Sequence, residues 1–274
     1  MKILDVQNLT VTTGDGSRVV SDVSFSIEPG ERLGLIGESG SGKSMTALAV
    51  MGLLPAELKA SGSLLLGNGK DAPQQVLESP EKTLNQIRGT VASIVFQEPL
   101  TALDPLMKIG RQLSEPLHRW QGLKGDALHS AVITALIEVR INNPERIAKS
   151  YPYEISGGER QRAAIAMALA CEPALLIADE PTTALDVTVQ AEILTLLDTV
   201  VSERGMSLLF ISHDLAVVSR ITDHVLVLKD GSVVESGSLH DILRSPQHPY
   251  TRDLVTSARE LDDALDIAQK SGGM

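Results

Sequence analysis

The sequence predicts an α/β fold with a parallel-sheet core, an antiparallel β subdomain and an inserted helical subdomain. Short continuous apolar runs such as 32–36 (RLGLI) alternate with helical patterns, which is typical of parallel strands covered by helices on both faces. Alternating apolar and polar residues at 3–12 (ILDVQNLTVT) indicate an antiparallel strand with one solvated face. Between about Glu98 and Ile155 the strand signal disappears and helical patterns replace it.

The N-terminal part of the chain contains the first strands and the first helix. The alternation at 3–12 repeats at 18–28, so both segments are predicted to be antiparallel edge strands. The apolar run at 32–36 is followed by a glycine-rich loop and then by a helical pattern from Lys43 to about Leu54. A strand, a glycine loop and a helix in this order form the supersecondary unit of phosphate-binding loops.

The rest of the chain continues the alternation of helices and strands. Helices are predicted at 108–121, 126–140, 160–171 and 188–203, and buried strands at 174–178 and 207–211. Residues 225–236 indicate two strands joined by Asp230-Gly231, a strong hairpin signal. We expect one domain over 1–240, with the helical subdomain at about 98–155 inserted in it. A short helical extension with a mobile polar tail is expected at 241–274.

Composition restricts the class of protein. The chain has 274 residues, of which 43% are hydrophobic, enough for a substantial core. The chain has 35 acidic and 24 basic residues, which gives a formal charge of −11. Since the electrostatic field of such a chain repels phosphate backbones, we expect no nucleic-acid partner. Uncharged apolar stretches fall short of the about 20 residues that a membrane helix needs, and Asp5 interrupts any N-terminal signal peptide. These features predict a cytosolic protein that reaches a membrane only through a partner.

Residues 37–44 (GESGSGKS) form a complete G-x-x-x-x-G-K-S pattern between a strand and a helix. The glycines let backbone N–H groups of this loop converge on phosphate oxygens at a helix N-terminus. Lys43 is expected to reach the β- and γ-phosphates of ATP, and the Ser44 hydroxyl to bind Mg²⁺. The predicted nucleotide-binding residues of the loop are Gly37, Ser39, Gly40, Ser41, Gly42, Lys43 and Ser44. The alternative, an ordinary glycine-rich turn, does not account for the complete pattern.

Two carboxylates follow the apolar strand in 174–180 (ALLIADE). Open α/β sheets place their ligands at the carboxyl ends of the strands, which is where Asp179 and Glu180 lie. Asp179 is predicted to hold Mg²⁺ through a water molecule, and Glu180 to act on the water that attacks the γ-phosphate. Such a pair can also be a structural cap or a surface charge, but its place downstream of a phosphate-binding loop favours catalysis.

Residues 155–162 (ISGGERQR) predict a second anion site, because Ser-Gly-Gly opens a helix and exposes backbone N–H groups at the positive end of its dipole. With this motif the chain resembles the ABC ATPase superfamily. The resemblance implies a P-loop NTPase of ABC ATPase type with a RecA-like core. It also implies that Ser156, Gly157 and Gly158 of one subunit contact the ATP held by another, so that two subunits enclose two nucleotides. Ser156 also suits a simple helix cap, and the two roles are compatible.

The other motifs of that family occur in the family's order. Gln97 resembles the glutamine that contacts Mg²⁺ and the attacking water, and is expected to serve as a catalytic residue and a metal ligand. Asp186, in the segment 184–186 (ALD), resembles the aspartate that faces the partner subunit, and it is expected to help bind the nucleotide. His213 resembles the switch histidine that contacts the γ-phosphate. The chain departs from many relatives in having no aromatic residue at 11–20 to stack on adenine. Either apolar residues such as Val19 or Val20 contact the base, or the base is loosely held.

Five stretches resemble the ATP-binding subunits of oligopeptide, dipeptide and nickel importers. They are GESGSGKS, 96–105 (FQEPLTALDP), 151–162 (YPYEISGGERQR), 178–194 (ADEPTTALDVTVQAEIL) and 245–255 (SPQHPYTRDLV). The resemblance implies an ATPase that powers import of peptides, nickel or a similar small solute. Its expected partners are two transmembrane permease subunits, a second ATPase subunit that is a copy or a paralogue, and indirectly an extracytoplasmic solute-binding protein.

The importer resemblance implies a peripheral location at the cytoplasmic face of the membrane, with segments 98–107 and 151–154 as the expected coupling surface. The alternative is a soluble ABC ATPase of DNA repair or translation. Those of DNA repair insert long coiled coils or zinc modules, for which the interval between Gln97 and Ser156 is too short. A regulatory subunit without turnover normally lacks Glu180 or His213, and both are present.

Overall fold

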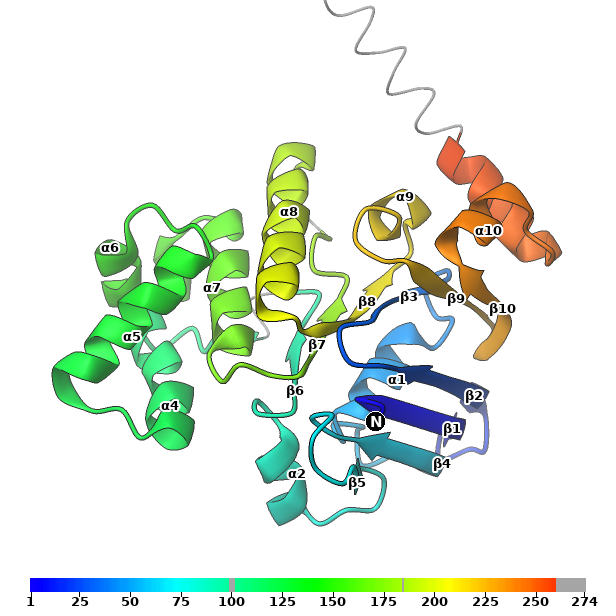
Figure 1. Cartoon of the computed structure of the whole chain (residues 1–274), viewed down its shortest axis with the longest axis horizontal. Helices are drawn as coiled ribbons and strands as arrows, with labels where there is room; N and C mark the ends of the chain where they lie inside the picture. The colour runs from blue at the N-terminus through cyan, green and yellow to red at the C-terminus, as the bar shows by residue number, and fades with distance from the viewer. Residues whose placement is uncertain (99–101, 184, 260–274) are drawn as a thin grey trace, which may run out of the picture.

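The computed structural model describes residues 1–98, 102–183 and 185–259 (Figure 1). Its larger sheet has six strands in the order β10-β9-β3-β8-β7-β6. The strands are β3 (Arg32–Ile36), β6 (Ala92–Val95), β7 (Leu175–Asp179), β8 (Ser207–Ser212), β9 (His224–Lys229) and β10 (Ser232–Ser238). All neighbours pair in parallel except β9 and β10, which form the predicted hairpin.

Every residue of β7 and β8 is buried, as expected for strands covered on both faces. Successive residues point to opposite faces of the sheet. Leu176 and Phe210 therefore belong to one apolar core, while Leu175 and Leu209 belong to the other. Because both faces of the sheet are covered by an apolar core, the sequences of these strands are continuously apolar.

The smaller sheet is antiparallel in the order β2-β1-β4-β5. Its strands are β1 (Leu4–Thr12), β2 (Arg18–Ile27), β4 (Lys59–Leu66) and β5 (Gln74–Gln75). The predicted antiparallel subdomain is confirmed, but the expectation that 3–12 forms an edge strand is wrong, because β1 pairs with both β2 and β4. A short helix, α2 (Glu81–Ile87), follows this sheet.

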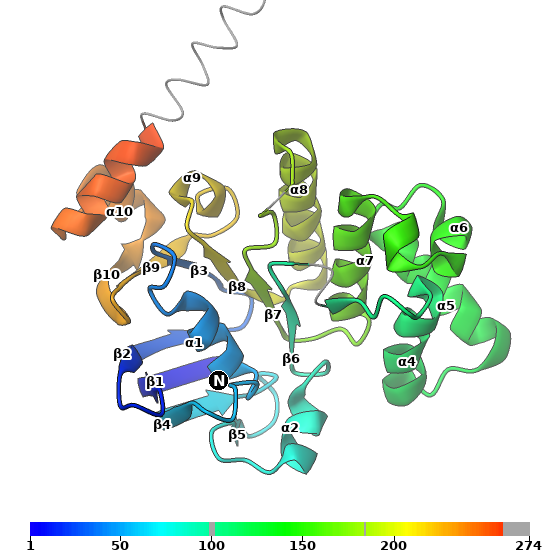
Figure 2. The ribbon, with the colours of Figure 1, turned by 180° about the vertical axis from the view of Figure 1, so that it is seen from behind.

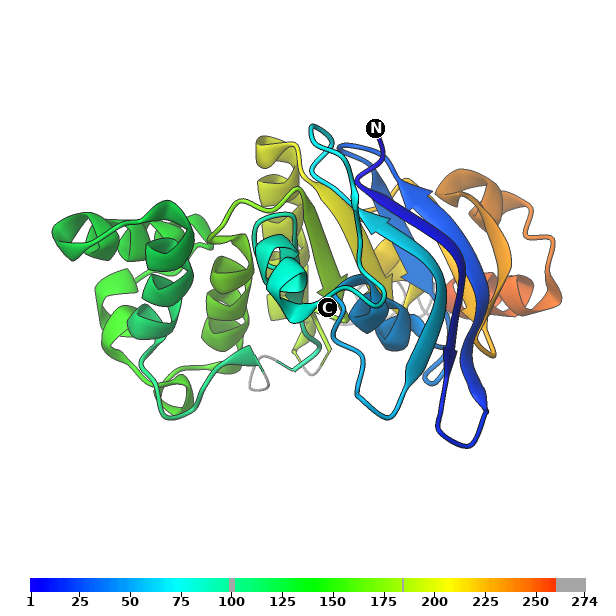
Figure 3. The same cartoon turned by 90° about the horizontal axis from the view of Figure 1, so that it is seen from below.

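Helix α1 (Lys43–Val50) lies between the two sheets, where it contacts β2, β4 and β7 (Figure 3). The predicted helix reached about Leu54, and the observed helix ends earlier. Gly52 takes a left-handed φ of 62°, and the Arg88 guanidinium donates hydrogen bonds to the carbonyl oxygens of Met51 and Gly52. These carbonyls therefore have a long-range partner in place of the helical bonds that a longer helix would give them.

The helical subdomain contains α4 (Ile109–Gln121), α5 (Gly125–Glu138) and α6 (Pro144–Lys149). Helices α4 and α5 pack on α7 (Gly157–Leu169), and α6 packs on α4 and α5. Helix α6 was not predicted, because six residues are too short to show a helical period. Its local signals are Asn143, which accepts a hydrogen bond from the N–H of Arg146, and Pro144 at the first helical position. Helix α7 begins three residues before the predicted 160–171, because Ser156 caps it.

The C-terminal part contains α8 (Val187–Arg204), α9 (Leu215–Val218), α10 (Leu239–Arg244) and helical residues 249–259. The last two lie beside β9 and β10, at the opposite end of the molecule from the helical subdomain (Figures 1 and 2). The expected mobile tail falls in 260–274, outside the described residues, and the boundary at 240 stays a prediction. Over the described ranges, none of the helices combines the length and the apolar character required to cross a bilayer.

Candidate active site

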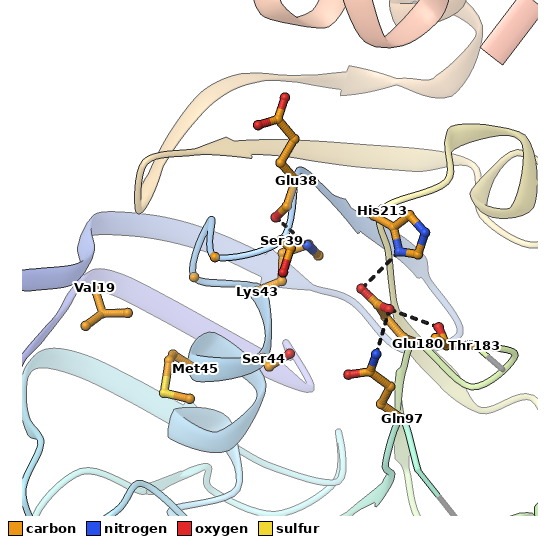
Figure 4. Close-up of a pocket in the computed structure, with 12 residues that line it drawn as sticks. Val19, Glu38, Ser39, Lys43, Ser44, Met45, Gln97, Glu180, Thr183 and His213 are labelled. Atoms are coloured by element: carbon orange, nitrogen blue, oxygen red, sulfur yellow. Dashed lines mark hydrogen bonds and ion pairs between the residues drawn. The ribbon is translucent and has the colours of Figure 1, made fainter. Parts of the chain in front are cut away.

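The carboxyl ends of the parallel strands carry a cavity of about 660 Å³ (Figure 4). Register aligns these ends, because Ile36 of β3 pairs with Ser212 of β8 and Asp179 of β7 pairs with Ile211. The loops that leave β3, β6, β7 and β8 therefore meet at one edge. The cavity is lined by Val19, Glu38, Ser39, Gly40, Gly42, Lys43, Ser44, Met45, Gln97, Glu180, Thr183 and His213.

The backbone of the 37–44 loop requires glycine at two positions. Gly42 has φ +98°, and a Cβ on it would lie 2.7 Å from the Val19 carbonyl oxygen. A Cβ on Gly37 would lie 2.2 Å from the Leu228 carbonyl oxygen. Any larger residue would push the loop away from β2 and β9, so the motif glycines are needed for packing as well as for backbone N–H access.

Lys43 is 4% exposed and its ammonium group lies inside the loop. Its Nζ donates to the carbonyl oxygens of Gly37 at 2.7 Å and Glu38 at 2.8 Å. Burial lowers the pKa of Lys43, and the negative charges of Glu180, Asp179 and Glu38 oppose that shift. The two bonds use two of the three N–H donors of the ammonium group, and the third suits a phosphate oxygen.

Ser44 and Asp179 form the pair that fits a Mg²⁺ ion. The Ser44 hydroxyl donates to Asp179 Oδ1 at 3.2 Å. Burial raises the pKa of Asp179, against the effects of this hydrogen bond and of Lys43. No group of three or more His, Cys, Asp or Glu side chains within the described ranges could hold a metal by itself. Two oxygen ligands suit Mg²⁺, which takes its remaining ligands from water and phosphate.

Glu180 is held by three side chains (Figure 4). Its Oε2 accepts from Gln97 Nε2 at 3.2 Å and from Thr183 Oγ1 at 2.9 Å, and its Oε1 lies 3.2 Å from His213 Nδ1. Its backbone takes a left-handed φ of 46°, and its N–H donates to the Ile211 carbonyl oxygen at 2.9 Å. The carboxylate is thus held in the cavity that the phosphate loop also lines, where a general base for water can act.

The Ser-Gly-Gly segment does not enter this cavity. Ser156 caps α7 as predicted: its Oγ accepts from the Glu159 N–H at 3.2 Å, and Glu159 Oε2 accepts from the Ser156 N–H at 2.9 Å. Ser156 and Gly157 are exposed, while a Cβ on Gly158 would lie 3.1 Å from Val189 Cγ1. The Gly157 and Gly158 N–H groups at the start of α7 therefore lie outside the chain's own cavity.

Asp186 does not line the cavity, and its neighbours Leu185 and Val189 approach the start of α7. Its Oδ1 accepts from the Val189 N–H at 3.0 Å and caps α8. The predicted site residues therefore form two groups. The first surrounds the cavity, with Gly37, Ser41 and Asp179 just behind its wall, and the second consists of Ser156, Gly157, Gly158 and Asp186.

Three cavity residues were missed from the sequence: Glu38, Met45 and Thr183. Thr183 has a usable signal, because it follows Glu180 by three residues in a tight turn. Of the two valines expected to contact adenine, Val19 lines the cavity and Val20 is fully buried. Ser41 Oγ is also buried, with no hydrogen-bond partner among the described residues, which is the environment that a phosphate oxygen would complete.

Comparison with known proteins shows to which family the chain belongs. The model of the ABC transporter family matches residues 20–183. The chain is 45% identical to the oligopeptide transport ATP-binding protein of Escherichia coli, over 95% of this chain and 77% of that protein. It is 47% identical to a peptidoglycan transport ATP-binding protein of Agrobacterium fabrum, over 93% of this chain but only 47% of that longer protein.

The fold is shared with a solved ATP-binding cassette, a dimer in a post-hydrolysis state bound to ADP and phosphate. The TM-score is 0.75 at 29% identity, and the match covers 86% of this chain and 98% of that one. The phosphate loop, the Asp-Glu pair and the Ser-Gly-Gly helix start thus occur on the fold that the sequence predicted. The chain belongs to the ABC transporter family and is one of its ATP-hydrolysing subunits.

Proposed function

We propose that this chain hydrolyses ATP to power import of peptides, as one of two ATPase subunits bound to a pair of transmembrane permeases at the cytoplasmic face of the membrane. The observation that carries the proposal is the division of the site residues. One cavity holds the phosphate loop and Glu180, while the Ser-Gly-Gly segment faces outward. The substrate class is supported by the similarity to an oligopeptide transport protein.

The proposed chemistry is attack of water on the γ-phosphate of ATP. Glu180 holds the water and accepts its proton, while Gln97, Thr183 and His213 keep the carboxylate oriented. Lys43 and the loop N–H groups bind the phosphate oxygens. Ser44, Asp179 and Gln97 are the proposed Mg²⁺ ligands, and the ion would neutralise charge between the β- and γ-phosphates.

The second group of residues is proposed to complete the site of a partner ATPase subunit. Gly157 and Gly158 present N–H groups at a helix start that Ser156 caps, and Asp186 begins the neighbouring helix α8. Since these residues do not line the chain's own cavity, two subunits in opposite orientation would each supply them to the other. The partner is a second copy or a related chain.

An exposed apolar surface in the helical subdomain is the proposed permease-binding site. Leu106 is 87% exposed and Tyr153 is 68% exposed. Tyr153 stacks on Tyr151 with ring centroids 5.5 Å apart, and Lys108 Nζ lies 5.6 Å from the Tyr151 ring centroid. Aromatic groups that are rigid and exposed suit protein contacts. Leu106 belongs to the expected coupling segment 98–107 and Tyr153 to the segment 151–154, and residues 99–101 lie outside the described residues.

Replacement of the exposed aromatic ring tests this docking surface. Tyr153→Ala is expected to reduce peptide uptake at least about 10-fold, because one buried interface aromatic commonly contributes about 2 kcal/mol. ATP binding by the isolated chain should not change, since Tyr153 does not line the cavity. The measurement is uptake into vesicles that contain the assembled transporter. Normal uptake by the variant would exclude Tyr153 from the permease contact.

Val19 is the proposed contact for adenine, and an aromatic residue there should strengthen nucleotide binding. Val19→Tyr is expected to lower the Kd for ATP about 5-fold or more, because stacking a base on an aromatic ring contributes about 1–3 kcal/mol. Val19→Ile is the matched control, since it adds apolar volume without a ring. Equilibrium binding of ATP and GTP measures the effect. An unchanged Kd in the tyrosine variant would place the base elsewhere.

Reconstitution tests the proposed function directly. We expect peptide-stimulated ATPase activity when the chain is combined with the two permeases and a peptide-binding protein in vesicles. The competing class, an ABC ATPase of DNA repair or translation, would instead show stimulation by nucleic acid. The formal charge of −11 argues against that class. Stimulation by nucleic acid but not by peptide would overturn the proposal.

A further inference from the structure

The segment 245–255 is fixed to the β9-β10 hairpin. The two carboxylate oxygens of Glu235 on β10 accept hydrogen bonds from the N–H groups of Gln247 and His248, at 2.8 and 2.9 Å. The Tyr250 N–H donates to His248 Nδ1 at 3.2 Å. These bonds hold the start of the last helical segment, residues 249–259, against the hairpin.

Tyr250 projects from this segment to the phosphate loop. It is 5% exposed, and Lys229 Nζ lies 4.9 Å from its ring centroid. Its hydroxyl oxygen accepts a hydrogen bond from the Glu38 N–H at 2.8 Å. Burial raises the pKa of Tyr250, so the hydroxyl stays neutral at physiological pH. Glu38 and Tyr250 are 212 positions apart, and the bond joins the C-terminal segment to the phosphate-binding loop.

The Glu38 N–H belongs to the same peptide group as the Gly37 carbonyl. That carbonyl oxygen accepts the 2.7 Å hydrogen bond from Lys43 Nζ. A peptide group is planar and stiff, so its N–H and C=O directions cannot turn independently. Tyr250 therefore holds one side of the group, and the orientation of the other side places the Lys43 ammonium group.

We propose that Tyr250 is a positioning residue for Lys43, acting through the Gly37–Glu38 peptide group to fix the ammonium group for the phosphates of ATP. The inference rests on the proposed phosphate-binding role of Lys43. It gives the 245–255 segment a function in the nucleotide site, although none of its residues lines the cavity.

The first test is Tyr250→Phe, which keeps the ring and its contact with Lys229 and removes only the hydroxyl. We expect the affinity of the full chain for Mg-ATP to fall about 3- to 10-fold, the range for one lost hydrogen bond. Thr256→Val is the matched control, because it removes an exposed hydroxyl that bonds the Arg252 carbonyl oxygen on the same helix. Binding is measured by isothermal titration calorimetry, and the thermal midpoint establishes that each variant is folded.

A double-mutant cycle separates positioning from a structural role. In a Lys43→Ala background, Tyr250→Phe should produce no further loss of Mg-ATP affinity, because the group that it positions is absent. An equal loss in both backgrounds, or unchanged affinity in the single Tyr250→Phe variant, overturns the proposal and leaves the role of Lys43 intact. Normal affinity in Lys43→Ala alone would instead overturn the proposed role of Lys43 itself.

Discussion

Replacement of Glu180 by Gln is expected to stop ATP hydrolysis and to trap an ATP-bound dimer. The amide keeps the size of the side chain and can still bond Gln97, Thr183 and His213, but it cannot accept a proton from water. Loss of a general base costs about 10²- to 10⁴-fold in rate, or roughly 3–5 kcal/mol of barrier. ATP binding should survive, since Lys43 and Ser44 are untouched.

The trapped state follows from the division of the site between two chains. Without hydrolysis the γ-phosphate would continue to bridge the phosphate loop of one subunit and the Ser-Gly-Gly segment of the other. Size-exclusion chromatography with Mg-ATP and with Mg-ADP should show an ATP-dependent dimer in the variant alone, beside a phosphate-release assay. Glu57→Gln makes the same chemical change at an exposed position and is the control.

Two outcomes would count against different parts of this account. Hydrolysis by Glu180→Gln at the wild-type rate would show that Glu180 is not the base. Loss of hydrolysis without a dimer would keep Glu180 as the base and indicate that the working partner is a paralogue rather than a second copy.

Replacement of Ser156 by Arg is expected to abolish turnover while Mg-ATP binding stays near normal. A bulky cation at the start of α7 would occupy the place of the partner's γ-phosphate, but Ser156 does not line the chain's own cavity. The expected fall in ATPase rate is at least about 100-fold, comparable to loss of a group that stabilises the transition state. The measurements are the ATPase rate of the assembled transporter and ATP binding by the isolated chain.

Two controls separate phosphate contact from helix capping. Ser156→Ala removes the cap hydroxyl, which costs about 1 kcal/mol of stability, yet it leaves the backbone N–H groups free for phosphate. Ser61→Arg places the same charge on β4, on an exposed residue of the other sheet. If the isolated Ser156→Arg chain lost ATP binding as strongly as the transporter lost ATPase activity, the segment would act on the nucleotide of its own chain.

The sequence by itself predicted those parts of the protein whose backbone conformation depends mainly on residues that are neighbours in the chain. The 37–44 loop is one such part, because its glycines and the following helix favour the backbone path of a phosphate-binding loop. The strand ending in Asp179 and the cap by Ser156 are others. Elements too short to show a period were missed, among them β5 and α6. The strand β4 was missed because its sequence, KASGSLLL, does not alternate.

Tertiary structure alone decided which distant residues meet. The positions of Gln97, Thr183 and His213 along the chain do not indicate that their side chains converge on Glu180. This convergence results from the order of β6, β7 and β8 in the sheet. The bond from Glu38 to Tyr250 is of the same kind. The physical reason is that residue periodicity encodes local backbone conformation and burial, whereas contacts between remote segments depend on how the buried faces of whole strands and helices pack together.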